Sequence, residues 1–427
     1  MRFKDWNANL KIRLGGEALV NITFWMFFPF LAIYFSEEFG KSLAGILLIV
    51  SQAFAVIANL MGGFFADRFG RKRMMVLASI GQGVAYLLFS LASSPWLDSA
   101  WIGFLCFTIV SVFSSIYYPA SQAMIADIVN ERDRSGVFAL FYTSVNIAVV
   151  IGPIVGSIFY KDHRFELLLL AGISNILLGI VYSKWIVETL PANLPQVRRS
   201  RETSGLHFLI SQVKDYGVII KDHVFLLFIV AGILNAMTFM QLDLLFPVYT
   251  KEVVDIQTLF QLGDWSFTVT GVKTFGLLVA ENGLFVVLFT IIVSRWMDRF
   301  KERNVFVAAS LVYGISMLIA GGTHLVWGLI LSMAIFTLGE LMTVGIQNSF
   351  ISKIAPGHMR GQYFAAASLR NTVGRMIAPL AIPMTEWFGN QATFAILCGF
   401  SVLSGILYFI MFQKHDRQTM IHSGQSL

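Results

Sequence analysis

The chain has 427 residues, of which 56% are hydrophobic and only 13% are charged, and its mean hydropathy is +0.71. This balance excludes a soluble globular protein and indicates a membrane protein with many spans. The Lys and Arg residues that give the net charge of +6 lie mainly between the apolar runs, as expected for the loops of a membrane protein. We therefore infer no nucleic-acid partner from this charge. Both cysteines, Cys106 and Cys398, lie inside apolar runs, so we expect neither a disulfide framework nor a metal site.

Twelve apolar segments are each long enough to cross roughly 30 Å of hydrocarbon as a helix. They occupy residues 14–36, 43–66, 74–94, 100–123, 136–160, 166–186, 224–248, 275–294, 304–322, 325–350, 361–383 and 390–412. The alternation typical of β-barrel strands does not occur in this sequence. No cleavage site follows the first apolar run, so we expect it to act as a signal anchor.

The basic residues predict how these spans are oriented. If both termini are cytoplasmic, 24 of the 31 Lys and Arg residues face the cytoplasm, five face outward and two lie inside the span at 361–383. We therefore predict an all-α, multi-pass protein of the bacterial cytoplasmic membrane. It would have twelve transmembrane helices and both termini in the cytoplasm.

The first span begins with Arg13 and Glu17, which lie one helical turn apart. The simplest interpretation is a local ion pair at the cytoplasmic mouth of the span. The alternative is that Glu17 faces a central cavity, together with Asn21 one turn further along. Trp25 and Phe28 would then offer apolar contacts to a ligand, unless they face lipid.

The loop after the second span combines glycines with a dense cluster of charge. It follows the pattern G-x-x-x-D-R-x-G-R-K, whose members are Gly63, Asp67, Arg68, Gly70, Arg71 and Lys72. Gly62 and Gly63 would allow another helix to approach closely, and Gly70 would permit a tight turn. Such a cluster is either a topogenic anchor for the helix ends or a latch that acts during conformational change.

The chain contains an internal repeat. Residues 294–303 form a degenerate copy of this loop and place Asp298 231 positions after Asp67. Four further residues recur at an offset of 226, where Ile125, Arg134, Phe138 and Pro153 match Ile351, Arg360, Phe364 and Pro379. The repeat predicts two pseudo-symmetric six-helix bundles, at 1–190 and 223–412. We expect 191–222 to be a cytoplasmic linker with an amphipathic helix, and 413–427 to be a cytoplasmic tail.

The fourth and fifth spans meet at a charged turn, in which Asp127 and Arg134 lie seven positions apart. This pair forms either a latch between helix ends or an ordinary solvated turn. The fifth span also contains Gly152, Pro153 and Gly156. The proline would bend the helix, and the two glycines, four positions apart, would allow another helix to pack tightly.

Most of the charge expected inside the bilayer lies in the second half. The residues concerned are Gln241 and Asp243 in the seventh span, Glu340 in the middle of the tenth, and Arg370 and Arg375 in the eleventh. An ionised side chain near the bilayer centre costs roughly 2.5–3.5 kcal/mol on insertion scales, so each charge requires a watery cavity or a partner. Glu281, nearer the outer end of the eighth span, is expected to reach water.

A carboxylate in a low-dielectric cavity has its charged form disfavoured, so it can bind and release a proton near the working pH. The same carboxylate attracts a cation, and competition between proton and cation is a physical mechanism for antiport. Asp243 and Glu340 are the candidates for this role. The alternative is that Glu340 is permanently paired with Arg370 or Arg375 and only ties two helices together.

The loop at 63–72 and the segment 148–157 resemble motifs of the drug/proton antiporters of the major facilitator superfamily. The resemblance implies that Asp243 and Glu340 handle protons and cationic drugs. One departure is Phe141, which replaces an additional membrane aspartate, so the number of protons moved is open.

The same resemblance implies that Asp67 and Asp127 take part in conformational switching, with Arg68, Arg71 and Arg134 nearby. Together with the glycines at 63 and 70, these residues form the expected cytoplasmic latch.

We therefore expect a monomeric, proton-coupled exporter of amphipathic, cationic drugs that works by alternating access. The candidate cavity residues are Glu17, Asn21, Trp25, Phe28, Asn146, Gln241, Arg370 and Arg375. The sequence contains no phosphate-binding loop and no nucleophile motif, so we expect a transporter driven by the proton gradient, without a cofactor, rather than an enzyme. One alternative is export of a metabolite, sugar or lipid-linked compound whose anionic group binds the two arginines. A receptor or assembly factor without transport is the other.

Overall fold

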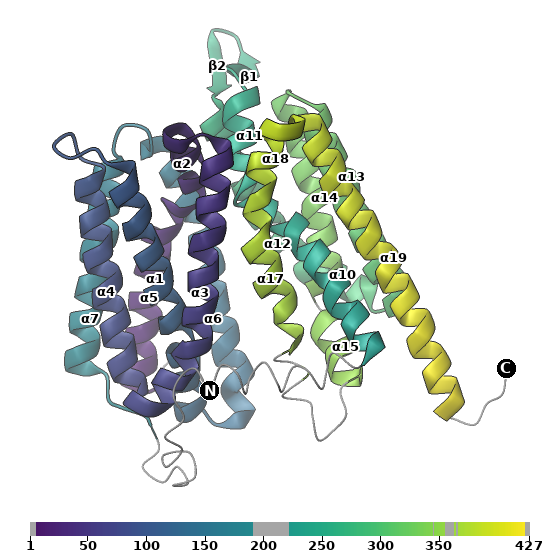
Figure 1. Cartoon of the computed structure of the whole chain (residues 1–427), viewed down its shortest axis with the longest axis horizontal. Helices are drawn as coiled ribbons and strands as arrows, with labels where there is room; N and C mark the ends of the chain where they lie inside the picture. Colours follow the sequence, from purple (N-terminus) through teal and green to yellow (C-terminus); the bar gives the residue numbers. More distant parts are fainter. Residues whose placement is uncertain (1–5, 191–221, 345, 355–362, 364–365, 423–427) are drawn as a thin grey trace. The chain divides into compact units, whose positions relative to one another are not determined.

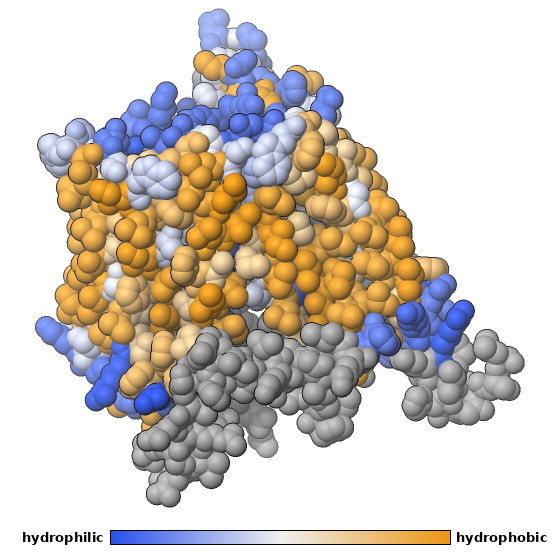
Figure 2. Space-filling view, in the orientation of Figure 1, coloured by the Kyte–Doolittle hydropathy of each residue, from blue (hydrophilic) through white to orange (hydrophobic). Residues whose placement is uncertain are grey.

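The computed structural model describes residues 6–190, 222–344, 346–354, 363 and 366–422, which are almost entirely helical (Figure 1). Among them, ten helices are long and apolar enough to cross a membrane, and a further apolar stretch, Thr143–Phe159, is shorter. Figure 2 shows apolar residues covering the middle of the helices and hydrophilic residues at their ends. The expected all-α membrane fold is confirmed.

The chain divides into two compact units. The first comprises Met1–Gly40 and Leu47–Ser211, and the second comprises Lys41–Ile46 and Gln212–Leu427. Nearly all of the expected linker, 191–222, lies outside the described residues, and so does the end of the expected tail. Residues 413–422 are helical, however, because the last helix continues beyond the apolar run that predicted its span.

The first unit consists of helices joined by short connections. They are α1 (Ala8–Trp25), η2 (Phe28–Phe30), α2 (Leu31–Phe39), most of α3 (Lys41–Phe69), α4 (Arg71–Ala92), α5 (Ala100–Ile128), α6 (Glu131–Phe159) and α7 (Arg164–Trp185). Its core includes a cluster around Met75, Met124 and Tyr182. α4 packs closely against α7 because Gly83 lies beside the carbonyl of Gly172, where a Cβ atom would come within 2.9 Å.

The second unit begins at the end of the linker and carries a small hairpin among its helices. Its elements are α10 (His223–Phe239), η3 (Met240–Leu242), α11 (Leu245–Val253), β1 (Gln257–Leu262), β2 (Trp265–Val269), α12 (Gly271–Met297), α13 (Glu302–Gly322), α14 (Val326–Val344), α15 (Ile346–Ile354), α17 (Leu369–Ile377), η4 (Ala378–Leu380), α18 (Ala381–Phe388) and α19 (Asn390–His422). The expected eleventh span therefore lies partly outside the described residues and continues as α17, η4 and α18.

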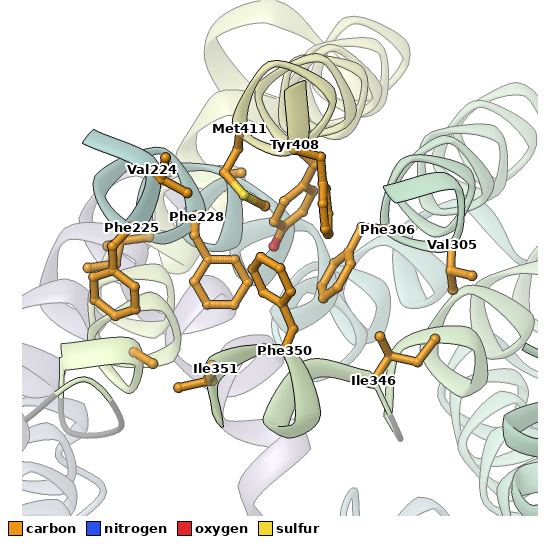
Figure 3. Close-up of a cluster of buried hydrophobic side chains, with 14 of the residues drawn as sticks. Val224, Phe225, Phe228, Val305, Phe306, Ile346, Phe350, Ile351, Tyr408 and Met411 are labelled. Atoms are coloured by element: carbon orange, nitrogen blue, oxygen red, sulfur yellow. The ribbon is translucent and has the colours of Figure 1, made fainter. Parts of the chain in front are cut away.

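The core of the second unit is aromatic (Figure 3). The rings of Phe228, Phe306, Phe350 and Tyr408 come from α10, α13, α15 and α19 and point toward one another, with centroids 4.9 Å apart for Phe306 and Tyr408 and 5.3 Å apart for Phe228 and Phe350. Offset and tilted aromatic pairs at these distances attract one another beyond their burial. This cluster holds four helices of the second unit together.

Three short 3₁₀ segments interrupt helices in the apolar regions. Pro29 in η2 and Pro379 in η4 lack an N–H group and cannot continue the helical hydrogen-bond pattern. η3 contains no proline, but Pro247 follows in α11 and cannot donate to the carbonyl of Asp243 four residues earlier. The chain is therefore irregular at the segment that carries the candidate aspartate.

Between α11 and α12, residues 257–269 form an antiparallel hairpin that the apolar pattern did not predict. Its two-residue turn contains Gly263 at φ +62°, a backbone conformation that glycine adopts at no steric cost. Alternating residues flanking a Gly-Asp pair are a hairpin signal that hydropathy alone overlooks. In Figure 1 the hairpin stands beyond the end of α11.

The first turn of α3 groups with the second unit, because its residues bind that unit's side chains. Glu386 in α18 accepts hydrogen bonds from the backbone and hydroxyl of Ser42, at 2.8 and 2.6 Å, and Lys41 pairs with Glu252. A carboxylate at a helix N-terminus is electrostatically favourable. These bonds from Ser42 lower the pKa of the Glu386 carboxyl.

Candidate functional site

The interruption at η3 places Gln241 and Asp243 in the interior of the second unit. Gln241 is fully buried, and its Nε2 donates to the carbonyls of Met237 at 2.7 Å and Ala378 at 3.1 Å. The side chain therefore bridges η3 to η4. Asp243 follows two positions later and is half-buried.

Glu340 lies in α14 and is held by polar neighbours from two helices. Its Oε2 accepts a hydrogen bond from Asn282 Nδ2 at 3.0 Å, and the same nitrogen donates to Thr337 Oγ1 at 2.9 Å. Asn282 is 6% exposed, whereas Glu340 is half-buried. One face of the carboxylate is thus fixed by Asn282.

Arg375 and Glu340 are the charged groups that act electrostatically on Asp243. Arg375 itself is exposed and lies in α17, just before η4. The structure therefore brings two carboxylates and one arginine of the expected set into a single electrostatic neighbourhood. Such an arrangement can exchange protons or hold a cation, because each carboxylate can be neutralised in either way.

Arg370 does not belong to this neighbourhood. Its guanidinium lies 4.3 Å from the ring centre of Phe228, its Nε donates to the carbonyl of Ala367 at 3.0 Å, and it also hydrogen-bonds Tyr408. Among the described side chains, neither Arg370 nor Arg375 forms an ion pair with Glu340. Permanent pairing of Glu340, the alternative considered above, is therefore not the arrangement found.

Glu281, the remaining carboxylate of the eighth expected span, is half-buried in α12. Its Oε2 is buried and has no hydrogen-bond partner among the described residues. That the carboxylate reaches water stays a prediction.

The first unit contains a different kind of charged cluster. Arg13 is 0% exposed and binds Glu17 Oε1 through Nε at 2.9 Å and Nη2 at 2.8 Å, which is the ion pair expected from their spacing. The hydroxyls of Tyr117 and Ser121 in α5 donate to the same oxygen, at 2.6 and 3.3 Å. Ser121 also accepts from Arg13. Glu17 is therefore neutralised by a fixed partner, unlike the carboxylates of the second unit.

The remaining cavity candidates of the first unit lie along α1, η2 and α6. Asn21, Trp25, Phe28 and Asn146 are half-buried, and Asn146 has a partner of its own. The rings of Trp25 and Phe28 meet edge-on at 5.6 Å. Gly152 and Gly156, on either side of Pro153, abut the chain at Trp25 and Met26, where a Cβ atom would approach within 2.5 Å and 2.1 Å. These glycines therefore allow the close packing of α6 that their spacing predicted.

The expected cytoplasmic latch is centred on Arg71. Its guanidinium pairs with Asp67 at 2.8 Å and with Asp127 at 3.2 Å, and it donates to the carbonyl of Ala66. Arg68 instead lies over the rings of Phe64 and Phe69. The side chain of Arg134 lies outside what the structure describes.

Glu188, which the sequence did not single out, completes this cluster. Its carboxylate accepts from the backbone N–H groups of Arg71 and Lys72 at 2.9 and 3.2 Å, so it caps the N-terminus of α4. Gly70 has φ +103°, and a Cβ atom there would lie 2.3 Å from Glu188 Oε2. Gly63 has open space around it, whereas Gly62 is the residue that touches α5, at Ile116. Of the two glycines predicted to allow a close approach, Gly62 therefore makes the contact and Gly63 does not.

Gly70→Ala is expected to lower the melting temperature of the purified protein, because the alanine would adopt a strained backbone conformation and collide with Glu188. Strain of this kind costs about 1–3 kcal/mol. Gly63→Ala is the matched control, since nothing lies within 4 Å of the added atom, and its melting temperature should stay at or slightly above the wild-type value. Equal effects of the two substitutions would contradict the account of the turn.

Comparison with models of protein families identifies the family of this chain. The model described as Major Facilitator Superfamily matches residues 14–379 and 264–425. The chain belongs to the Major Facilitator Superfamily. It is therefore an integral membrane transporter and not an enzyme, as the sequence predicted.

Relatives within the Major Facilitator Superfamily cover nearly the whole chain. A protein of Planococcus maritimus named Na(+), Li(+), K(+)/H(+) antiporter is 56% identical over 421 residues, covering 98% of this chain and 99% of that protein. Multidrug resistance protein MdtH of Proteus mirabilis is 22% identical over 87% of this chain and 88% of its own length. A crystal structure of a POT family transporter in complex with 5-aminolevulinic acid has a TM-score of 0.77 at 18% identity, covering 97% of this chain and 98% of that one. This last likeness concerns the fold alone.

Two features of this superfamily member escaped the sequence analysis. Asn282 donates to Glu340 and also to Thr337, yet Asn282 and Thr337 lie 55 positions apart and carry no charge that would draw attention in an apolar span. Glu188 lies close to the end of the first predicted bundle, at residue 190, and nothing else in the sequence singled it out.

Among the described residues, no group of His, Cys, Asp or Glu side chains is arranged to hold a metal ion.

Proposed function

We propose that this protein is a proton-coupled antiporter that exchanges monovalent alkali cations for protons across the cell membrane. The observation that carries the proposal is the 56% identity, over 98% of the chain, to a protein named as an antiporter of Na⁺, Li⁺ and K⁺ against H⁺. Asp243 and Glu340 support it, because carboxylates offer the oxygen ligands that hard cations prefer, and neither forms an ion pair with the described side chains.

In this proposal Asp243 and Glu340 bind a proton or a cation in turn. A proton neutralises a carboxylate without needing further ligands, whereas a cation also needs neutral oxygens around it. Because the two ligands compete for the same negative charge, loading one favours release of the other. Asn282 would hold the Glu340 carboxylate in place for either ligand.

Alternating access would let the loaded site face each side of the membrane in turn, with the protein acting as a monomer in the bacterial cytoplasmic membrane. The cluster of Asp67, Arg71 and Asp127 would act as the cytoplasmic latch, because its ion pairs join α3, α4 and α5 at their ends. The closed state would be favoured while these pairs are intact.

Export of amphipathic, cationic drugs is the second candidate. It is favoured by the residue patterns around Asp67, Asp243 and Glu340, which resemble those of the lactococcal proton-driven multidrug exporter, and by the relatives named MdtH. The half-buried aromatic pair of Trp25 and Phe28 would supply apolar contacts. Export of an anionic metabolite has less support, because Arg370 is buried against Phe228 rather than presented to a ligand.

The test is proton movement in liposomes that contain the purified protein and a pH-sensitive dye. NaCl, LiCl, KCl, choline chloride and a panel of cationic dyes are added one at a time. We expect the three alkali salts to drive protons across the membrane, choline to have no effect, and Asp243→Asn to remove the response. A response to the dyes alone would favour drug export instead.

A further inference from the structure

The second unit contains buried side-chain oxygens that no donor binds. Asn235 Oδ1, Gln241 Oε1 and Glu281 Oε2 have no hydrogen-bond partner among the described residues. An unsatisfied buried polar atom costs about 1–3 kcal/mol, and a bound water or ion is one way in which a native protein satisfies it. The first unit also contains such atoms, among them the hydroxyl oxygens of Ser36 and Ser51 and Arg13 Nη1, a donor that would repel a cation.

Gln241 is the most tightly defined of these residues. Its amide nitrogen lies between two backbone carbonyls, those of Met237 and Ala378, at 2.7 and 3.1 Å. Since carbonyls only accept, the atom between them must be the nitrogen and the amide cannot be turned over. Oε1 is therefore held in place as an acceptor, inside a side chain that is 0% exposed.

Gln241 connects two helix interruptions of the second unit. It lies in η3, and its partner Ala378 opens η4, so the amide sits where two interrupted helices touch. Secondary transporters bind ions at such interruptions near the membrane midplane. Asp243, two positions later, supplies negative charge, and Pro247 leaves the carbonyl of Asp243 without its helical donor.

We propose that Gln241 Oε1 is a ligand of the transported alkali cation, in a state in which the cation has lost its water and is enclosed by protein. This inference rests on the proposed function. A dehydrated cation needs protein oxygens in place of its hydration shell, and a fixed, neutral oxygen can discriminate between ions by size and field strength. Asp243 provides charge compensation, and Gln241 sets the preference among Na⁺, Li⁺ and K⁺.

The experiment compares Gln241→Leu with wild type in the liposome assay and in a thermal-shift titration with NaCl, LiCl, KCl and choline chloride. We expect the half-maximal Na⁺ concentration to rise at least tenfold, which corresponds to about 1.4 kcal/mol, and the order of preference among the three cations to change. Asn175→Leu is the matched control. Asn175 is 2% exposed and donates to the carbonyl four residues earlier, as Gln241 does, but lies in the first unit.

Three outcomes separate this inference from the proposed function. If wild type shows no cation response in either assay, the proposed function fails. If wild type responds and Gln241→Leu keeps both its half-maximal concentrations and its order of preference, the function stands and the ligand role is overturned; an oxygen that binds only water would give this result. Should Gln241→Leu not fold, Gln241→Asn retains the amide but withdraws the oxygen by one methylene, and the same change in preference is expected.

Discussion

Glu340→Gln is expected to reduce cation-driven proton movement a hundredfold or more while the protein remains folded. Glutamine keeps an oxygen that can accept the hydrogen bond from Asn282, so the local packing is preserved. It cannot carry the negative charge that a proton or a cation must neutralise, so both halves of the exchange are lost. The measurement is the initial rate of dye response in liposomes after a NaCl pulse.

Glu166→Gln is the matched control for this substitution. Glu166 is 58% exposed at the start of α7 and lies near His163 on the surface of the first unit. The same chemical change there should leave the rate at the wild-type value. A Glu340→Gln protein that exchanges cations for protons at the wild-type rate would falsify the role of Glu340 and leave Asp243 as the sole candidate carboxylate.

Arg13→Met is expected to destabilise the first unit by about 3–5 kcal/mol, because it leaves the Glu17 carboxylate inside the protein without its partner. Arg13 is 0% exposed and donates twice to one oxygen of Glu17, whose own side chain is only 16% exposed, so water compensates poorly for the lost charge. Thermal unfolding followed by intrinsic fluorescence in detergent measures the effect.

The double variant Arg13→Met/Glu17→Gln separates charge from packing. If the damage comes from an unpaired buried charge, removing that charge should restore most of the lost melting temperature. A double variant that is no more stable than Arg13→Met alone would mean that the guanidinium acts mainly by packing, for instance against the ring of Phe141, 5.0 Å away.

The helices and the two candidate carboxylates could be predicted because both follow from the cost of placing groups in lipid. Long apolar runs must satisfy their backbone internally, so they are helical. A lone aspartate or glutamate within such a run, as at positions 243 and 340, is expensive and therefore conspicuous. Neither prediction depends on which helices are neighbours.

The partners of those carboxylates could not be predicted, because pairing depends on which helices are neighbours. Glu340 binds Asn282 and not an arginine, although Arg370 and Arg375 are nearer in sequence, because the choice depends on how α12 and α14 face each other. The same limit explains why the sequence did not show which of Gly62 and Gly63 meets a neighbouring helix. A one-residue difference is a rotation of about 100° around a helix, and a run of apolar residues does not fix it.

The carboxylate of Glu188 connects two parts of the chain that lie far apart in the sequence. It receives the first two backbone N–H groups of α4 from residues 117 and 116 positions earlier, and it also accepts from the backbone of Thr189 and Leu190. The segment from Arg71 to Glu188, with its four helices, thus has its two ends fastened at a single side chain. Because the first turn of α4 and the chain beyond α7 share this carboxylate, a displacement of one displaces the other.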